Sequence, residues 1–270
     1  MNHKFISAVK ALKWYSYIGI DDNIIYDGTA SLDQFNSISI SKAKTLIAKN
    51  SVGFNNNNQN THLAVLSNSR QLADMAHTLE DLKSSVTSFD GCLLKKTALN
   101  TVFGDGIPSA PIMLIGEAPG QNEDKHGIPF CGESGKLLDN MLQSINLSRT
   151  KNVYITNTVF WRPPANRRPT SDELVICRPF VEKHIAIINP KLIILVGSTA
   201  ATNMLGDHVK ISKIRQEYFL YKNCYLTFSI PITAIFHPAY MLRQPLQKKA
   251  CWFDLLKIQQ FILQKKYITI

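Results

Sequence analysis

The 270-residue sequence has no C-x-x-C pair, nothing that resembles a signal peptide, and no apolar run of transmembrane length. Its five cysteines are odd in number, which argues against a disulfide framework and favours free thiols in a reducing, cytoplasmic setting. Lysines interrupt the apolar N-terminal stretch, whereas a spanning helix needs about 20 consecutive apolar residues. We therefore expect a protein that has no membrane partner.

The common phosphate-binding motifs are also missing. The pair Gly135-Lys136 cannot end a Walker loop, because Phe130 stands where the first glycine of that motif is needed. Gly116 and Gly120 are four residues apart, so the dinucleotide fingerprint G-x-G-x-x-G is absent as well. The sequence thus lacks the signatures of P-loop and dinucleotide-binding enzymes.

Acidic residues are scarce in the last part of the chain. The formal net charge is +10, and residues 208–270 alone hold ten Lys/Arg against two acidic residues. A basic segment of this kind is typical of a protein that binds a polyanion. The alternative is that these lysines are only the solvated surface of a generally basic protein.

The N-terminal part of the chain differs from the rest. Residues 1–52 read as an N-terminal extension of short helices, residues 53–62 as an Asn-rich linker, and residues 63–270 as the main domain. At the start of that domain, apolar residues recur at spacings of three and four between Leu72 and Val86, and this predicts one amphipathic helix.

Four short apolar runs alternate with helical patterns in the main domain. The runs at 111–116, 152–157, 191–197 and 231–236 are typical of buried parallel strands. Helices are predicted from the apolar stripe at 137–145, from a capping box at Thr170 and Glu173, and from a stripe that starts at Trp252. This alternation predicts a doubly wound α/β sandwich, whose ligands bind at the carboxyl ends of the strands.

Polar and aromatic residues follow three of these runs. Glu117 and His237 come directly after two of them, Asn157 is the last residue of another, and Phe130 follows shortly after the first. An amide can pair with the edge of a base, an aromatic ring can stack on it, and a histidine can stabilise charge on a leaving group. In a basic protein, this set fits an enzyme that flips a base out of nucleic acid. Taken singly, a turn cap, a core phenylalanine and a loop histidine explain them equally well.

Three motifs in this order resemble the family 4 uracil-DNA glycosylases. They are "GEAPGQNEDKHGIPFCGESGKLLD", "VYITNTVFWRPPANRRP" and "HPAYMLR", and the likeness covers roughly residues 89–270. The resemblance implies a three-layer αβα sandwich with a four-stranded parallel sheet, as in the uracil-DNA glycosylase superfamily. It also implies a monomeric base excision repair enzyme that hydrolyses the N-glycosidic bond of deoxyuridine in single- or double-stranded DNA and leaves an abasic site.

The resemblance also implies roles for individual residues. His237 would support negative charge on uracil O2, and Glu117 or Glu123 would orient the attacking water. The implied substrate-binding residues are Gly116, Ala118, Gly120, Phe130 and Asn157. The implied DNA-binding residues are Arg162, Arg167, Met241, Leu242 and Arg243.

One feature of the family is altered in this sequence. The family holds a 4Fe-4S cluster on four cysteines, whose matching positions here are Phe89, Cys92, Trp161 and Cys177. Cluster iron is normally held by four thiolates, and two of the four are replaced by aromatic residues. We therefore expect no cofactor and no metal, with apolar packing in place of the cluster.

Two competing functions remain at this stage. The first is a non-catalytic or covalent uracil-DNA binder of the same superfamily. A related branch traps DNA on a histidine in an inserted Arg-Ile-His run, and no such run follows "WRPPANRRP". The second is an enzyme for free nucleotides, which the basic C-terminal third disfavours.

Overall fold

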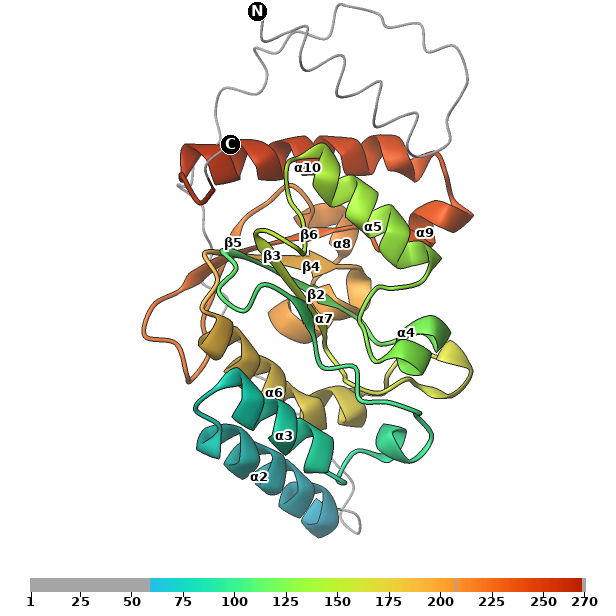
Figure 1. The fold of residues 1–270 in the computed structure, drawn as a ribbon, viewed down its shortest axis with the longest axis vertical. Coiled ribbons are helices and arrows are strands. Elements are labelled where there is room, and N and C mark those ends of the chain that lie inside the picture. The colour runs from blue at the N-terminus through green and yellow to red at the C-terminus, as the bar shows by residue number, and fades with distance from the viewer. Residues whose placement is uncertain (1–58, 207, 269–270) are drawn as a thin grey trace, which may run out of the picture.

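A six-stranded mixed sheet lies at the centre of the domain, and helices cover both of its faces (Figure 1). The computed structural model describes residues 59–206 and 208–268. The strands are β1 (Asp105–Gly106), β2 (Ile112–Gly116), β3 (Val153–Asn157), β4 (Leu192–Val196), β5 (Phe219–Tyr221) and β6 (Ile230–Ile235). Their order across the sheet is β1-β3-β2-β4-β6-β5.

The four central strands, β3, β2, β4 and β6, run parallel and correspond to the four predicted apolar runs. Every residue of β2, β3 and β4 is buried. That burial explains why they appear as continuous apolar runs without alternation. The predicted α/β sandwich with a four-stranded parallel sheet is confirmed, and the structure adds β1 and β5 as short antiparallel edge strands.

The helices form layers on either side of this sheet (Figure 1). They are α2 (Gln59–Met75), α3 (Leu79–Ser88), α4 (Gln121–His126), α5 (Glu133–Ser144), α6 (Ser171–Ile188), α7 (Ser198–Leu205), α8 (Ile211–Ile214), α9 (Pro238–Arg243) and α10 (Gln247–Gln264), with 3-10 turns η3 (Leu93–Lys96) and η4 (Pro164–Asn166). Helices α5 and α10 cover one face, α6 and α7 cover the other, and α2 and α3 pack on the outside of α6.

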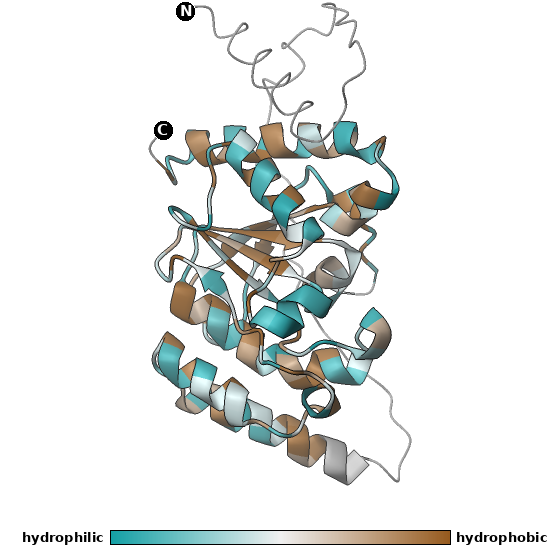
Figure 2. Cartoon of the chain, turned by 45° about the vertical axis from the view of Figure 1, so that its right-hand side comes forward, coloured by the Kyte–Doolittle hydropathy of each residue, from teal (hydrophilic) through white to brown (hydrophobic). Residues whose placement is uncertain are grey.

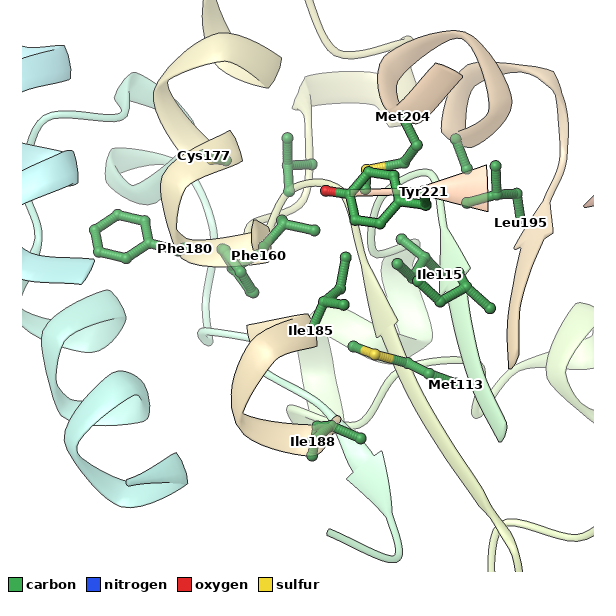
Figure 3. Close-up of a cluster of buried hydrophobic side chains, with 14 of the residues drawn as sticks. Met113, Ile115, Phe160, Cys177, Phe180, Ile185, Ile188, Leu195, Met204 and Tyr221 are labelled. Carbon is green, nitrogen blue, oxygen red and sulfur yellow. The ribbon is translucent and has the colours of Figure 1, made fainter. Parts of the chain in front are cut away.

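Alternate residues of β2 point into two separate cores. Met113 and Ile115 pack toward α6, and Ile112 and Leu114 pack toward α5 and α10. Figure 2 shows mostly hydrophobic strands in the sheet, between helices in which hydrophobic and hydrophilic residues are mixed. Figure 3 shows the α6 side of the core, where Met113 and Ile115 meet side chains from α6 and β4.

The boundary of the domain differs from the prediction. Helix α2 begins at Gln59, inside the segment 53–62 that was predicted to be a linker, and it packs against α6. The predicted extension, residues 1–52, lies outside the described residues. No helix in residues 59–206 and 208–268 is long and apolar enough to span a membrane.

The amphipathic pattern from Leu72 to Val86 forms two helices instead of one. Thr78 starts α3 with a capping box: its hydroxyl accepts from the Asp81 N–H at 3.1 Å, and the Asp81 carboxylate accepts from the Thr78 N–H at 2.9 Å. A capped break of this kind changes the helix direction, so Met75 at the end of α2 is exposed.

Candidate active site

A cavity of about 880 Å³ opens at the carboxyl ends of the parallel strands. It gathers most of the residues singled out in the sequence. Its lining includes Glu117, Ala118, Gly120, Glu123, Phe130, Asn157, Arg167, His237 and Arg243. This is the edge of a parallel sheet where ligands bind in doubly wound folds.

Asn157 lines the cavity, and Gly116 lies beside it. The two residues are paired in register at the ends of β2 and β3. A Cβ at Gly116 would collide with Asn157 Oδ1 and with the ring of Phe130, so only glycine lets both side chains lie against the backbone here. Asn157 is 1% exposed, and its Oδ1 has no hydrogen-bond partner within the described chain. An unpaired buried acceptor is costly, which indicates that a donor on a ligand completes it.

An aromatic wall stands beside this amide. Phe130 lies in the loop between α4 and α5, with a left-handed backbone at φ 51° and a side chain that is buried. The centroid of its ring is 5.6 Å from that of His237, and the two rings are inclined by 32°. The cavity therefore has an aromatic face next to an unpaired amide, an arrangement that suits a flat polar ligand.

His237 begins α9 and is held by its own helix. Its Nδ1 accepts a hydrogen bond from the Ala239 N–H at 3.1 Å, which leaves Nε2 to carry the proton of a neutral imidazole. Burial and, to a smaller extent, the positive charge of Arg243 lower the pKa of His237 to about 4, while Glu123 opposes the shift. At neutral pH the side chain is thus an uncharged N–H donor.

Behind His237, the end of β4 makes room for this ring. Gly197 has a φ of 98°, and a Cβ there would lie 3.0 Å from the Cβ of His237. Gly197 and Ser198 also line the cavity. In the sequence these residues begin the stretch "GSTAA", whose small side chains predict tight helix packing and do not by themselves indicate a cavity wall.

The two candidate carboxylates have different surroundings. One oxygen of Glu123 accepts from the N–H groups of Cys131 and Gly132 at 2.9 and 2.8 Å, and the other accepts from the Gly120 N–H at 3.1 Å. Glu123 therefore ties the two ends of the cavity loop together. The Glu117 side chain lines the cavity and has no hydrogen bond or ion pair among the described residues.

The predicted DNA-binding arginines also differ from one another. Arg167 donates two hydrogen bonds to Glu173, at 2.6 and 2.9 Å, so its charge is already paired. Arg162 donates to Asn166 at 2.7 Å. Arg243, together with Arg168, which the sequence reading did not single out, lines the mouth of the cavity.

Met241, one of the predicted DNA-binding residues, is 0% exposed and belongs to the core under α5 and α10. Its neighbours Leu242 and Arg243 are exposed. In a helix of six residues only one face points outward, and the sequence alone does not say which.

The four positions that match cluster cysteines form part of the α6-side core. Cys92 and Cys177 are both fully buried, and the neighbouring Cys92 thiol together with burial raises the pKa of Cys177 well above its ordinary value. Figure 3 shows Cys177 on α6 near Phe160 and Phe180.

The two aromatic residues at these positions are buried in the same core. Phe89 packs edge-on against Phe180 with ring centroids 5.2 Å apart. Trp161 packs edge-on against Phe160, and its indole N–H donates to Thr101 at 3.0 Å. No three His, Cys, Asp or Glu residues of the described ranges lie close enough to hold a metal ion. These residues do not fit an iron–sulfur cluster.

Comparison with known proteins places this site in a family. The model of the uracil DNA glycosylase superfamily matches residues 103–256. The chain is 38% identical to the type-4 uracil-DNA glycosylase of Sulfurisphaera tokodaii over 72% of this chain and 89% of the relative. It is 35% identical to that of Archaeoglobus fulgidus over 70% of this chain and 96% of the relative. The chain therefore belongs to the type-4 uracil-DNA glycosylases of the uracil DNA glycosylase superfamily.

Proposed function

We propose that this protein hydrolyses the N-glycosidic bond of deoxyuridine in DNA, so that uracil is released and an abasic site remains. The observation that carries the proposal is the unpaired, buried Oδ1 of Asn157, which lies against Gly116 next to the ring of Phe130 in the lining of the cavity. The relatives named type-4 uracil-DNA glycosylases support it.

Asn157 would read the edge of the flipped base. Uracil offers an N3–H donor and an O4 acceptor, which match the oxygen and the NH2 group of one carboxamide. Cytosine offers an acceptor at N3 and a donor at position 4, so it would leave the buried Oδ1 unpaired. A site with a buried polar group of this kind rejects the wrong partner through the cost of desolvation without a hydrogen bond.

His237 would stabilise the leaving group. As the bond between C1′ and N1 breaks, its electron pair moves onto the uracil ring and negative charge builds at O2. A neutral imidazole with its proton on Nε2 can donate a hydrogen bond to that oxygen, and the Ala239 N–H on Nδ1 keeps the proton at Nε2. A donor fixed in place before the reaction needs no reorganisation during it.

Glu117, and not Glu123, would orient the attacking water. Both oxygens of Glu123 are occupied by backbone N–H groups, whereas the Glu117 carboxylate faces the cavity without a partner among the described residues. A water held by Glu117 would attack C1′ and pass a proton to the carboxylate. Glu123 would act by holding the loop on either side of Phe130.

Arg243, Arg168, Arg162 and Leu242 would hold the DNA around the flipped nucleotide. Arg243 and Arg168 line the mouth of the cavity, and Leu242 is exposed beside them. Arginine contacts to phosphate position a duplex without reading its sequence. Arg167 would contribute less, because Glu173 neutralises its charge.

We also propose that the protein works without an iron–sulfur cluster. Two thiols and two buried aromatic side chains occupy the four matching positions, and four thiolates are needed. The cavity residues lie at the sheet edge, while these four side chains belong to the core against α6, so packing there can replace the cluster without touching the reacting groups. A cytoplasmic, monomeric enzyme, as expected from the sequence, is part of the same proposal.

One assay tests the function. An oligonucleotide with a single uracil is incubated with the protein, heated with alkali, and examined for strand scission at the uracil position, in single- and double-stranded form. Scission at that position supports the glycosylase. Uncleaved DNA that stays attached to the protein in denaturant would indicate the covalent binder, and uncleaved free DNA would contradict the proposed reaction.

A further inference from the structure

The peptide that carries the aromatic wall is held in an unfavourable conformation. Phe130 has φ 51°, in the left-handed region that is unfavourable for a residue with a side chain. Its carbonyl also lies so close to α5 that any Cβ at Gly135 would collide with it. A bulky residue keeps this conformation only when neighbouring groups hold it there.

The guanidinium of Arg149 holds that peptide. Arg149 precedes β3, and its side chain is 15% exposed. Nη1 donates to the Pro129 carbonyl at 3.0 Å, and Nη2 donates to the Phe130 carbonyl at 2.9 Å. The planar guanidinium thus binds two successive carbonyls of the loop, which a lysine with a single ammonium group does less well.

Two carboxylates hold Arg149 in turn. Nη1 also lies 2.9 Å from Asp105 of β1, and Nε donates to Asp139 of α5 at 3.0 Å. Burial raises the pKa of Asp139, and Arg149 opposes that shift. The guanidinium is therefore fixed between the sheet edge, α5 and the loop.

The opposite side of Phe130 is held by Glu123, which accepts from the next two N–H groups along the chain. Arg149 itself is not among the residues that line the cavity. Its contacts are with the loop backbone, and the loop carries the ring.

We infer that Arg149 is a positioning residue for uracil excision, which sets the ring of Phe130 beside His237 without touching the substrate. The inference rests on the proposed function, because it assigns Arg149 an effect on the stacking of the flipped base. It predicts that the effect of Arg149 passes through Phe130.

A double-mutant cycle tests this inference. Arg149→Met, Phe130→Ala and the double variant are compared with the parent for kcat/KM on a uracil oligonucleotide and for affinity to uracil-free DNA. Arg149→Met should lower kcat/KM by at least about fivefold, the lower end of what loss of base stacking costs. In the Phe130→Ala background the same change should have less than about a twofold effect, since coupled residues are not additive.

The control variant is Asp90→Asn, which makes the same chemical change at a carboxylate that is paired with Lys95 and contacts neither Arg149 nor the loop. It should stay within about twofold of the parent, as expected for an exposed ion pair. Affinity for uracil-free DNA should not change in any variant. If Arg149→Met does not fold, Arg149→Lys carries the same cycle.

The outcomes separate the two claims. A parent protein that releases no uracil overturns the proposed function. An active parent with equal losses from the Arg149 substitution in both backgrounds, or with no loss at all, overturns the positioning role alone. A loss that disappears when Phe130 is already alanine supports it.

Discussion

Replacing His237 by alanine should separate catalysis from folding. The change removes the Nε2–H donor and also the Nδ1 acceptor that caps α9. Loss of one preorganised donor to a developing oxyanion costs roughly 3–4 kcal/mol, or about 10²–10³ in rate. Loss of an N-cap costs about 0.5–2 kcal/mol of stability. Since a domain of this kind has about 5–15 kcal/mol of stability, the variant should stay folded while uracil release slows.

A second substitution distinguishes the effect on catalysis from the effect on stability more clearly. His237→Asn keeps a side-chain acceptor for the Ala239 N–H but has no imidazole to reach the base. Its melting temperature should be close to that of the parent, while its single-turnover rate should remain as low as that of the alanine variant. The reasoning is refuted if asparagine restores both the stability and the rate, or if the alanine variant loses rate only in proportion to its unfolded fraction.

The pH dependence of the parent gives an independent check. The pKa of His237 is lowered to about 4 in the folded protein, so the imidazole stays neutral at pH 5–8. As the pH falls through about 4, Nδ1 takes up a proton and can no longer accept from the Ala239 N–H, so the ring is no longer the neutral donor held by its helix. Because the unfolded side chain takes up its proton near pH 6.5, this group also removes stability as the pH falls from about 6.5 to 4. A rate that drops near pH 6.5 in the parent but not in His237→Asn would contradict a neutral donor.

Three further predictions concern recognition and the altered cluster positions. Asn157→Asp should reduce discrimination between uracil and cytosine by about 10–100-fold, the cost of a mismatched buried polar group, and an unchanged ratio of excision rates would mean that Asn157 does not read the base. Arg168→Gln with Arg243→Gln should weaken binding to all DNA sequences alike and lower the salt slope by about 0.9 for each lost phosphate contact, whereas an unchanged slope would exclude such contacts. The purified protein should contain no stoichiometric iron or sulfide, and Phe89→Cys with Trp161→Cys should allow anaerobic reconstitution; about four irons per parent chain would contradict this.

The sequence predicts the central sheet well because parallel strands buried on both faces leave an unmistakable apolar signal. The edge strands β1 and β5 have only two and three residues and are mostly half-buried, so they carry no such pattern. The break between α2 and α3 depends on the Thr78 capping box, which lies inside a region of continuous helical periodicity.

The candidate site likewise contains some residues whose position the sequence predicts and others whose position it does not. Asn157 and His237 follow strands, and the topology brings strand ends together, so their meeting in one cavity could be expected. The role of Arg149 could not be predicted from the sequence, because it depends on hydrogen bonds to two backbone carbonyls that lie 19 and 20 residues earlier in the chain. The burial of Met241 depends on the rotation of a short helix about its axis. The difference between Glu117 and Glu123 depends on hydrogen bonds from backbone N–H groups, which a sequence motif does not reveal.

The cysteines differ in burial, so the reactivity of each thiol can report the unfolding of the part of the domain around it. Cys224 is exposed and Cys131 is half-buried, whereas Cys92, Cys177 and Cys251 are buried. The first two buried thiols lie in the core against α6, and Cys251 lies in the core against α10, on the other face of the sheet. An alkylating reagent followed by peptide mass analysis would therefore time the opening of the two faces separately, without any added label. Cys92 and Cys177 remain as thiols beside the aromatic side chains. Their alkylation rate, compared with that of Cys251, would show whether the domain unfolds as one unit or as two layers.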